Sequence, residues 1–182
     1  MGTLIDALLA VDGVLAEAGV PHALCGGLAA NLYREEVRAT NDVDLAVAIG
    51  PARVVEIVDA FGRAGWSAAP YRQRGEQLKL TRRGMPRVDC IIATTDYERA
   101  AVERSVPATI EGREIPVLTP EDLIVFKLMA GRARDYEAVA AIINARGREL
   151  DVAYIEGWLE QFDNASAWPR ALEEARREAG SG

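Results

Sequence analysis

Hydrophobic patterns of two kinds follow one another along this chain of 182 residues, and their order limits the folds it can adopt. Up to about residue 117, short alternating apolar runs stand between amphipathic segments, which predicts strands and helices in turn. From residue 118 onward the apolar spacing is helical, with joints near Gly131, Gly147 and Asn164. The sequence therefore predicts an α+β (mixed α/β) fold, in which a small mixed β-sheet is flanked by helices and followed by a C-terminal helical extension.

The first part of the chain contains the strand candidates. Strands are expected at residues 22–25, 42–49, 76–83 and 86–92, with a short pair around Ile110 and Val117. Helices are expected at residues 4–18, 28–33, 51–64 and 97–104. The strands are too few and too irregularly spaced for a Rossmann sheet. The glycines after the expected strand at residues 22–25 do not form the G-x-G-x-x-G fingerprint of dinucleotide binding. We expect residues 1–117 to form a core and residues 118–182 to pack on it as a helical segment.

The composition is that of an ordinary soluble globular protein, with 49% hydrophobic and 27% charged residues. No apolar run approaches the ~18 residues of a membrane span. The N-terminal region carries Asp6, Asp12 and Glu17 within its apolar part, unlike a signal peptide. A single histidine and two cysteines argue against a zinc site or a centre of several histidines. These features predict a cytoplasmic protein with no membrane partner.

Three aspartates in two strand candidates could form a metal site. Asp42 and Asp44 stand two positions apart, so the period of a strand places both carboxylates on one face. Two like charges so close repel unless a cation lies between them, and Mg²⁺ prefers oxygen ligands of this kind. Asp89 lies in another apolar strand, and three acids on neighbouring strands could hold two metal ions ~3.5–4 Å apart, as in nucleotidyl transfer. A D-x-D pair alone is common, so a solvated strand end is the alternative interpretation.

The pair Gly26-Gly27 stands between an expected strand and an expected helix. Glycines let the backbone turn tightly and bring N–H groups close to an anion, and the start of a helix adds its positive dipole. A Gly-Gly pair also occurs in ordinary strand-to-helix turns, so by itself it is a weak indication of phosphate binding.

Taken together, these motifs resemble those of the nucleotidyltransferase superfamily that includes DNA polymerase β. Residues 24–47 read LCGGLAANLYREEVRATNDVDLAV, which contains an apolar residue, Gly-Gly, a helical spacer and Asp-apolar-Asp. The R-x-T-x-D-x-D pattern of residues 38–44 looks like the branch that contains the AbiEii-type toxins. Residues 115–143 add a Pro-Glu-Asp-Leu helix start, a lysine, an arginine and a basic-Asp pair in the order common in that branch. The match covers about residues 20–145.

The resemblance implies a role for each motif residue of the first part. The three aspartates would ligate two Mg²⁺ or Mn²⁺ ions, with Asp89 a shared ligand or the base for the acceptor hydroxyl. Gly26 and Gly27 would cradle the triphosphate. Arg38 and Thr40 would shape the approach to the carboxylates.

The helical segment supplies the other implied residues and completes the nucleotide site in this interpretation. Lys127 and Arg132 would neutralise phosphate charge, and Asp135 would orient one of them. Arg134 stands seven residues after Lys127, so an unbroken helix would place these two on one face instead. The sequence leaves open which arginine faces the phosphates. Lys127 as a solvated helix residue and Asp135 as a cap of a helix restarting after Gly131 are the structural alternatives.

The implied reaction is transfer of a nucleoside monophosphate from a nucleoside triphosphate, ATP included, to a hydroxyl acceptor, with release of pyrophosphate. The acceptor could be tRNA, a protein or a small molecule. The AbiEii resemblance adds a possible role as the toxin of a toxin–antitoxin system, with an antitoxin as partner. The alternative function is a non-catalytic nucleotide-binding or interaction module on the same fold.

The net charge of −7 hides a basic segment at residues 63–87, which carries +6. One interpretation is an edge strand at residues 76–83, protected by charge against pairing with other chains, with Leu78, Leu80 and Arg82 facing inward. The other is that these arginines contact the triphosphate or a polyanionic acceptor such as tRNA.

Overall fold

The computed structural model describes residues 2–70 and 77–180. The chain forms two compact units. The sheet unit comprises Met1–Leu28 and Ala39–Leu118, and the helical unit comprises Ala29–Arg38 and Thr119–Gly182. Residues 29–38 thus belong with the C-terminal helices, whereas the sequence was divided only once, after residue 117. The expected packing of residues 118–182 on the core stays a prediction.

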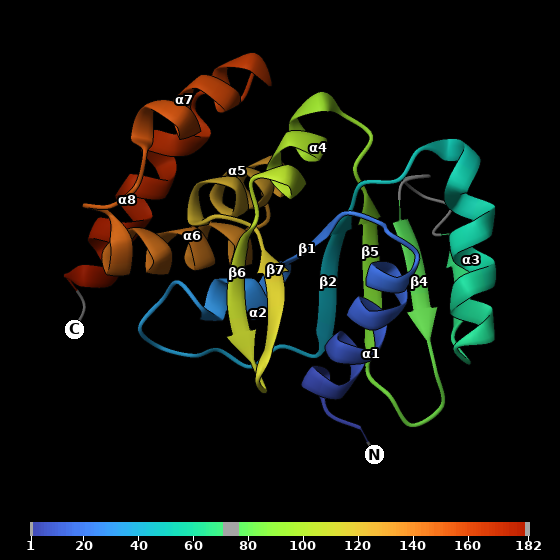
Figure 1. Ribbon diagram of the computed structural model, residues 1–182. Coiled ribbons are helices and arrows are strands. Elements are labelled where there is room, and N and C mark those ends of the chain that lie inside the picture. The colour runs from blue at the N-terminus through green and yellow to red at the C-terminus, as the bar shows by residue number, and fades with distance from the viewer. Residues whose placement is uncertain (1, 71–76, 181–182) are drawn as a thin grey trace. The chain divides into compact units, whose positions relative to one another are not determined.

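The sheet unit is built on a mixed sheet that has seven strands in the described residues, as the α+β prediction requires (Figure 1). The order of the strands is β3-β4-β5-β2-β1-β7-β6. Strand β2 is parallel to β5 and β1 is parallel to β7, and the other neighbours are antiparallel. The strands are β1 (His22–Cys25), β2 (Asp42–Val47), β3 (Ser67–Pro70), β4 (Gln77–Thr81), β5 (Arg87–Ile92), β6 (Val106–Ile110) and β7 (Arg113–Val117).

One strand in the basic segment was not predicted, and two expectations about this segment are wrong. Strand β3 was not predicted, because SAAP offers neither alternation nor large apolar residues. Since β3 pairs with β4, β4 lies inside the sheet and is not the charge-protected edge strand of the sequence interpretation. Leu78 and Leu80 are buried as expected, but β4 ends at Thr81, so Arg82 follows the strand and is exposed instead of facing inward. Arg72 and Arg74 lie outside the described residues.

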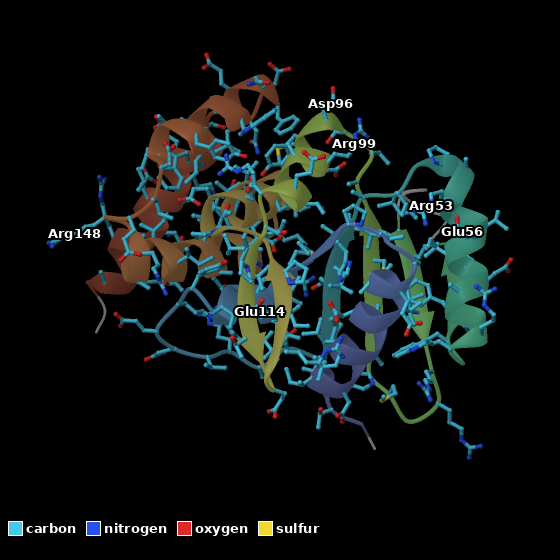
Figure 2. All side chains as sticks on the ribbon, in the orientation of Figure 1. Arg53, Glu56, Asp96, Arg99, Glu114 and Arg148 are labelled. Carbon is cyan, nitrogen blue, oxygen red and sulfur yellow. The ribbon has the colours of Figure 1, made fainter. Side chains whose placement is uncertain are left out.

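Helices of the sheet unit begin and end close to the expected positions. Helix α1 (Leu4–Glu17) starts with a capping box in which Thr3 and Asp6 bond each other's backbone N–H groups. It packs on β2 and β5 (Figure 1). The predicted helix over 51–64 is a 3-10 turn, η1 (Pro51–Arg53), followed by α3 (Val54–Arg63). Arg53 and Glu56 form an exposed ion pair of 3.0 Å there (Figure 2).

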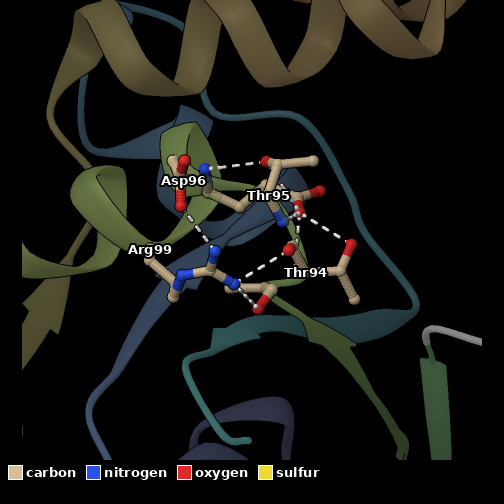
Figure 3. A network of polar contacts seen from close by, with 6 residues as sticks. Thr94, Thr95, Asp96 and Arg99 are labelled. Carbon is tan, nitrogen blue, oxygen red and sulfur yellow. Dashed lines mark hydrogen bonds and ion pairs between the residues drawn. The ribbon is translucent and has the colours of Figure 1, made fainter.

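Helix α4 (Asp96–Glu103) follows β5 and is fixed by a polar network at its start (Figure 3). Thr95 accepts a hydrogen bond from the backbone N–H of Glu98, and the Glu98 carboxylate accepts from the N–H groups of Thr94 and Thr95. Arg99 donates to the Thr94 carbonyl oxygen at 2.8 Å and pairs with Asp96 at 2.6 Å. This network sets where the chain turns after leaving the end of β5.

A buried ionic cluster joins α1, β1 and β7. The Asp12 carboxylate, 5% exposed, accepts from His22 Nε2 at 3.0 Å and from Arg113 Nη2 at 2.7 Å. His22 Nδ1 lies 2.8 Å from the Val20 carbonyl oxygen. Both ring nitrogens of His22 therefore lie within hydrogen-bond distance of an oxygen. These contacts fix the side chain of His22 between β1 and α1.

The helical unit holds four helices in addition to residues 29–38 in the described part of the chain. They are α5 (Pro120–Ala130), α6 (Ala133–Arg146), α7 (Val152–Gln161) and α8 (Ala167–Ala179). The expected joints are confirmed: Gly131 follows the end of α5, Gly147 follows the end of α6, and Asn164 lies between α7 and α8. No helix among the described residues is long and apolar enough to cross a membrane.

Candidate active site

The parallel pairing of β2 with β5 brings the three predicted aspartates to one face of the sheet. In this register Asp44 stands opposite Asp89. Asp42 and Asp44 alternate with the buried Val43, and Asp89 lies between the buried Val88 and Cys90. The apolar neighbours therefore anchor the opposite face and hold the carboxylates on the accessible one.

Arg87 joins this group, and sequence reasoning assigned it no individual role. It stands opposite Asp42 in the β2–β5 register and two positions before Asp89, so it shares their face. Its Nη2 atom lies 2.5 Å from Asp42 Oδ2 and 3.0 Å from Asp89 Oδ2. One guanidinium nitrogen thus bridges two of the three carboxylates and offsets part of their repulsion.

Asp89 is the more buried of the two carboxylates that pair with Arg87. Its side chain is 19% exposed, against 32% for Asp42. Its Oδ1 atom is buried and has no hydrogen-bond partner among the described residues. Burial raises the pKa of Asp89 above its usual value, and the nearby Arg87 and Lys79 cations counteract this in part. Asp89 is therefore a carboxylate with an unused acceptor and an environment that favours holding a proton.

Gly26 makes a close approach to Asp44 possible. Helix α2 (Gly26–Asn31) begins directly after β1, so both glycines lie in its first turn. The predicted helix 28–33 had placed them before the helix. Gly26 has φ +65°, a conformation that L side chains rarely adopt. A Cβ atom at this position would lie 1.9 Å from Asp44 Oδ2. The backbone at Gly26 and the Asp44 carboxylate therefore occupy space that no other residue type would leave open.

Gly27 and Thr40 meet in the same part of the sheet unit. A Cβ atom at Gly27 would lie 2.8 Å from Thr40 Oγ1. The Thr40 hydroxyl also lies 3.4 Å from Asp42 Oδ1, the distance of a weak hydrogen bond. Gly26, Gly27, Thr40 and the three aspartates are thus one local arrangement. Their roles toward a triphosphate stay predictions.

The helical unit contains a second charged group. The Asp135 carboxylate is 3% exposed and accepts from Arg132 Nε at 2.6 Å and from the Arg132 backbone N–H at 3.2 Å. Lys127 Nζ lies 4.0 Å from Asp135 Oδ1, and its side chain is 11% exposed. Asp135 therefore both caps α6 and contacts the two cations that the resemblance assigned to phosphate.

The two candidate arginines differ in their surroundings. Because the chain leaves the helical conformation at Gly131, Lys127 and Arg134 do not share one unbroken helix, and the argument that would place them on one face fails. Both arginines are exposed, and Arg132 forms an ion pair with Asp135. Which of them faces phosphate stays a prediction.

Arg38 lies in the helical unit. Its guanidinium pairs with Glu137 at 2.9 Å, with both side chains about half exposed. Its backbone N–H donates to Asn31 Oδ1 and its carbonyl oxygen accepts from Asn31 Nδ2. These contacts fix the turn after α2. The expectation that Arg38 shapes the approach to the carboxylates is not tested by them.

The oxygen atoms of the three aspartates suit a hard divalent cation, but the side chains are not arranged around a common metal position. Among residues 2–70 and 77–180, no three His, Cys, Asp or Glu side chains form a ready-made group for a metal ion. Arg87 Nη2 lies between Asp42 and Asp89, where a metal ion shared by these two carboxylates would otherwise lie. Three carboxylates on one face and the unpartnered Asp89 Oδ1 are nevertheless the oxygen chemistry that Mg²⁺ and Mn²⁺ prefer.

Solved structures define the fold class. ANT(2")-Ia in complex with adenylyl-2"-tobramycin matches with a TM-score of 0.62 and 16% identity, over 88% of this chain and 99% of that one. An antigenic nucleotidyltransferase-like protein from Paracoccidioides brasiliensis gives a TM-score of 0.56 and 16% identity, over 94% and 92%. The lincosamide antibiotic adenylyltransferase LnuA with lincomycin bound gives 0.54 and 14%, over 75% and 94%. The fold is that of the nucleotidyltransferases.

The family follows from the sequence pattern itself. The chain belongs to a nucleotidyltransferase family of unknown function, DUF6036, which matches residues 15–168. No curated protein matches the chain. The predicted superfamily is therefore confirmed, and the AbiEii-type branch stays a prediction.

Proposed function

We propose that this protein is a metal-dependent nucleotidyltransferase, which moves a nucleoside monophosphate from a nucleoside triphosphate to a hydroxyl acceptor and releases pyrophosphate. The observation that carries the proposal is the face of β2 and β5, where Asp42, Asp44 and Asp89 gather beside the backbone of Gly26. Family membership supports the same reaction class.

The three aspartates would hold Mg²⁺ or Mn²⁺. A divalent ion held there would stabilise charge at the transferring phosphate and would lower the pKa of a bound hydroxyl. Asp89, whose Oδ1 atom has no hydrogen-bond partner among the described residues, would be a shared ligand or the base that accepts the proton of the acceptor hydroxyl. The proton leaves the acceptor oxygen as that oxygen bonds to phosphorus and pyrophosphate departs.

The backbone at Gly26 and Gly27 would approach the triphosphate closely, since no side chain covers it. Lys127 and Arg132, both in contact with Asp135, are the proposed cations for phosphate charge. Substituting Lys127 with Met should raise the KM for the triphosphate more than it lowers kcat, because the lysine acts by binding.

A small-molecule hydroxyl is the first acceptor we propose. ANT(2")-Ia and LnuA share the fold, and the names of their bound compounds identify antibiotics as their ligands. Transfer to tRNA or to a protein, the reaction expected of an AbiEii-type toxin, is the other outcome that the experiment below distinguishes.

The test incubates the protein with each α-labelled nucleoside triphosphate, Mg²⁺ or Mn²⁺, and separate pools of tRNA, protein and small molecules from a cell extract. We expect label in the small-molecule pool, dependent on metal, and abolished in Asp44→Ala. The matched control is Asp59→Asn, an exposed aspartate of α3, which should transfer at the normal rate. Triphosphate binding without transfer to any pool would contradict the proposal and favour the non-catalytic module.

A further inference from the structure

The position of Arg87 suggests a role that the transfer chemistry alone does not assign. Its Nη2 atom contacts oxygens of both Asp42 and Asp89, on two neighbouring strands. A metal ion shared by those two oxygens would have to lie in the space this nitrogen takes, because Mg²⁺ binds oxygen at about 2.0–2.1 Å. The guanidinium and the ion also carry charge of the same sign.

We propose that Arg87 is an internal counter-ion, which holds Asp42 and Asp89 together in the metal-free protein and must be displaced before a metal ion can bind them. This inference rests on the proposed function, since it concerns the same carboxylates. Because Arg87 and the metal ion compete for the same carboxylates, metal should bind only where it is abundant or where it arrives together with an anion such as the triphosphate.

Burial and register show that the exchange is feasible. The Arg87 side chain is 43% exposed, so its guanidinium can swing into solvent without unpacking the core. Asp89 on β5 and Asp42 on β2 belong to paired strands, so the backbone keeps both residues in place when the guanidinium leaves. Part-exposed ion pairs of this kind are weak enough for a divalent cation to replace.

Lys79 is a second cation near Asp89. Lys79 on β4 stands opposite Asp89 on β5. In the same way, Arg87 on β5 stands opposite Asp42 on β2. Arg87 forms ion pairs with both Asp42 and Asp89. A neutral residue at 87 would therefore remove the bridge and leave the cation at Lys79 in place.

The experiment titrates MnCl₂ alone against the full chain and follows bound Mn²⁺ by electron paramagnetic resonance, for wild type, Arg87→Gln and Arg83→Gln. Arg83 is an exposed arginine of the same hairpin, so its substitution removes the same charge without removing the bridge. We expect Arg87→Gln to bind Mn²⁺ about tenfold more tightly than wild type, from the loss of two part-exposed ion pairs. Arg83→Gln should stay within about twofold.

Unfolding temperature provides a second readout. In a chelator Arg87→Gln should unfold at a lower temperature than wild type, because three carboxylates then lie together without their counter-ion. In excess Mn²⁺ the difference should vanish or change sign. A residue that only stabilises the fold would give the same deficit in both conditions.

Mn²⁺ affinity in Arg87→Gln that is equal to or weaker than wild type overturns the inference, as does a stability deficit that Mn²⁺ leaves unchanged. If Arg87→Gln does not fold, the ¹⁵Nε signal of Arg87 in the wild type decides: a signal that MgCl₂ at saturation does not move overturns it. The transfer assay is independent, so metal-dependent transfer with no change in Mn²⁺ affinity would refute the role of Arg87 and leave the proposed function standing.

Discussion

Replacing Gly26 with alanine tests the close approach between the backbone and Asp44. The added Cβ would lie 1.9 Å from Oδ2, 2.5 Å from Cγ and 2.6 Å from Cβ of Asp44, so the carboxylate must move. The residue also has φ +65°. A left-handed conformation costs an alanine about 1–2 kcal/mol, and forcing an extra carbon into a packed site costs about 1–3 kcal/mol more. The free energy of unfolding should fall by about 2–5 kcal/mol.

Gly19 provides the matched control, because it has φ +60° and nothing within 4 Å of an added Cβ. Gly19→Ala should show the backbone cost alone, about 1–2 kcal/mol. Urea unfolding of both variants isolates the steric part as the difference between them. Gly26→Ala should also lose Mn²⁺ binding, since Asp44 is displaced, while Gly19→Ala retains it. Equal losses of stability and equal Mn²⁺ binding in the two variants would refute the account of this contact.

Three further predictions concern buried polar groups. Asp12→Ala should lower the free energy of unfolding by about 3 kcal/mol, because it leaves the buried His22 without its carboxylate; a change below about 0.5 kcal/mol in urea would contradict this. Tyr154→Phe should cost about 1.5–3 kcal/mol, since the Tyr154 hydroxyl donates to the fully buried Asp122 at 2.6 Å, and an unchanged melting temperature would be the contrary result. Burial raises the pKa of Cys90, so this thiol should react with a disulfide reagent only after unfolding, and rapid native modification would count against its placement.

The sequence predicts the elements around the carboxylates well, because their signals are local. Alternation of apolar residues identifies β2 and β5, and the two glycines mark the turn from β1 into α2. Strand β3 was not predicted, because Ser67–Pro70 has small side chains and lacks a period-2 pattern. The error about β4 has a different cause: whether a strand lies at an edge depends on its neighbours, and β3 is one of them.

The details of the charged groups are also decided at long range. Arg87 is an ordinary basic residue in the sequence, and only the parallel register of β2 with β5 places it opposite Asp42. The signal that could have found it is its position two residues before Asp89, which puts both side chains on one face of a strand. In the helical unit, the predicted joint at Gly131 separates Lys127 from Arg134, so helical spacing counted across it does not place these two side chains on one face.

The rate of pyrophosphate release from a nucleoside triphosphate, in the presence of Mg²⁺ and acceptor, tests the central claim most directly when wild type is compared with Asp44→Asn. Asparagine keeps the size of Asp44 beside Gly26 and removes the charge that a metal requires. The account predicts a loss of at least about a hundredfold with an unfolding temperature close to that of the wild type. Release at the wild-type rate by a folded Asp44→Asn protein would contradict it.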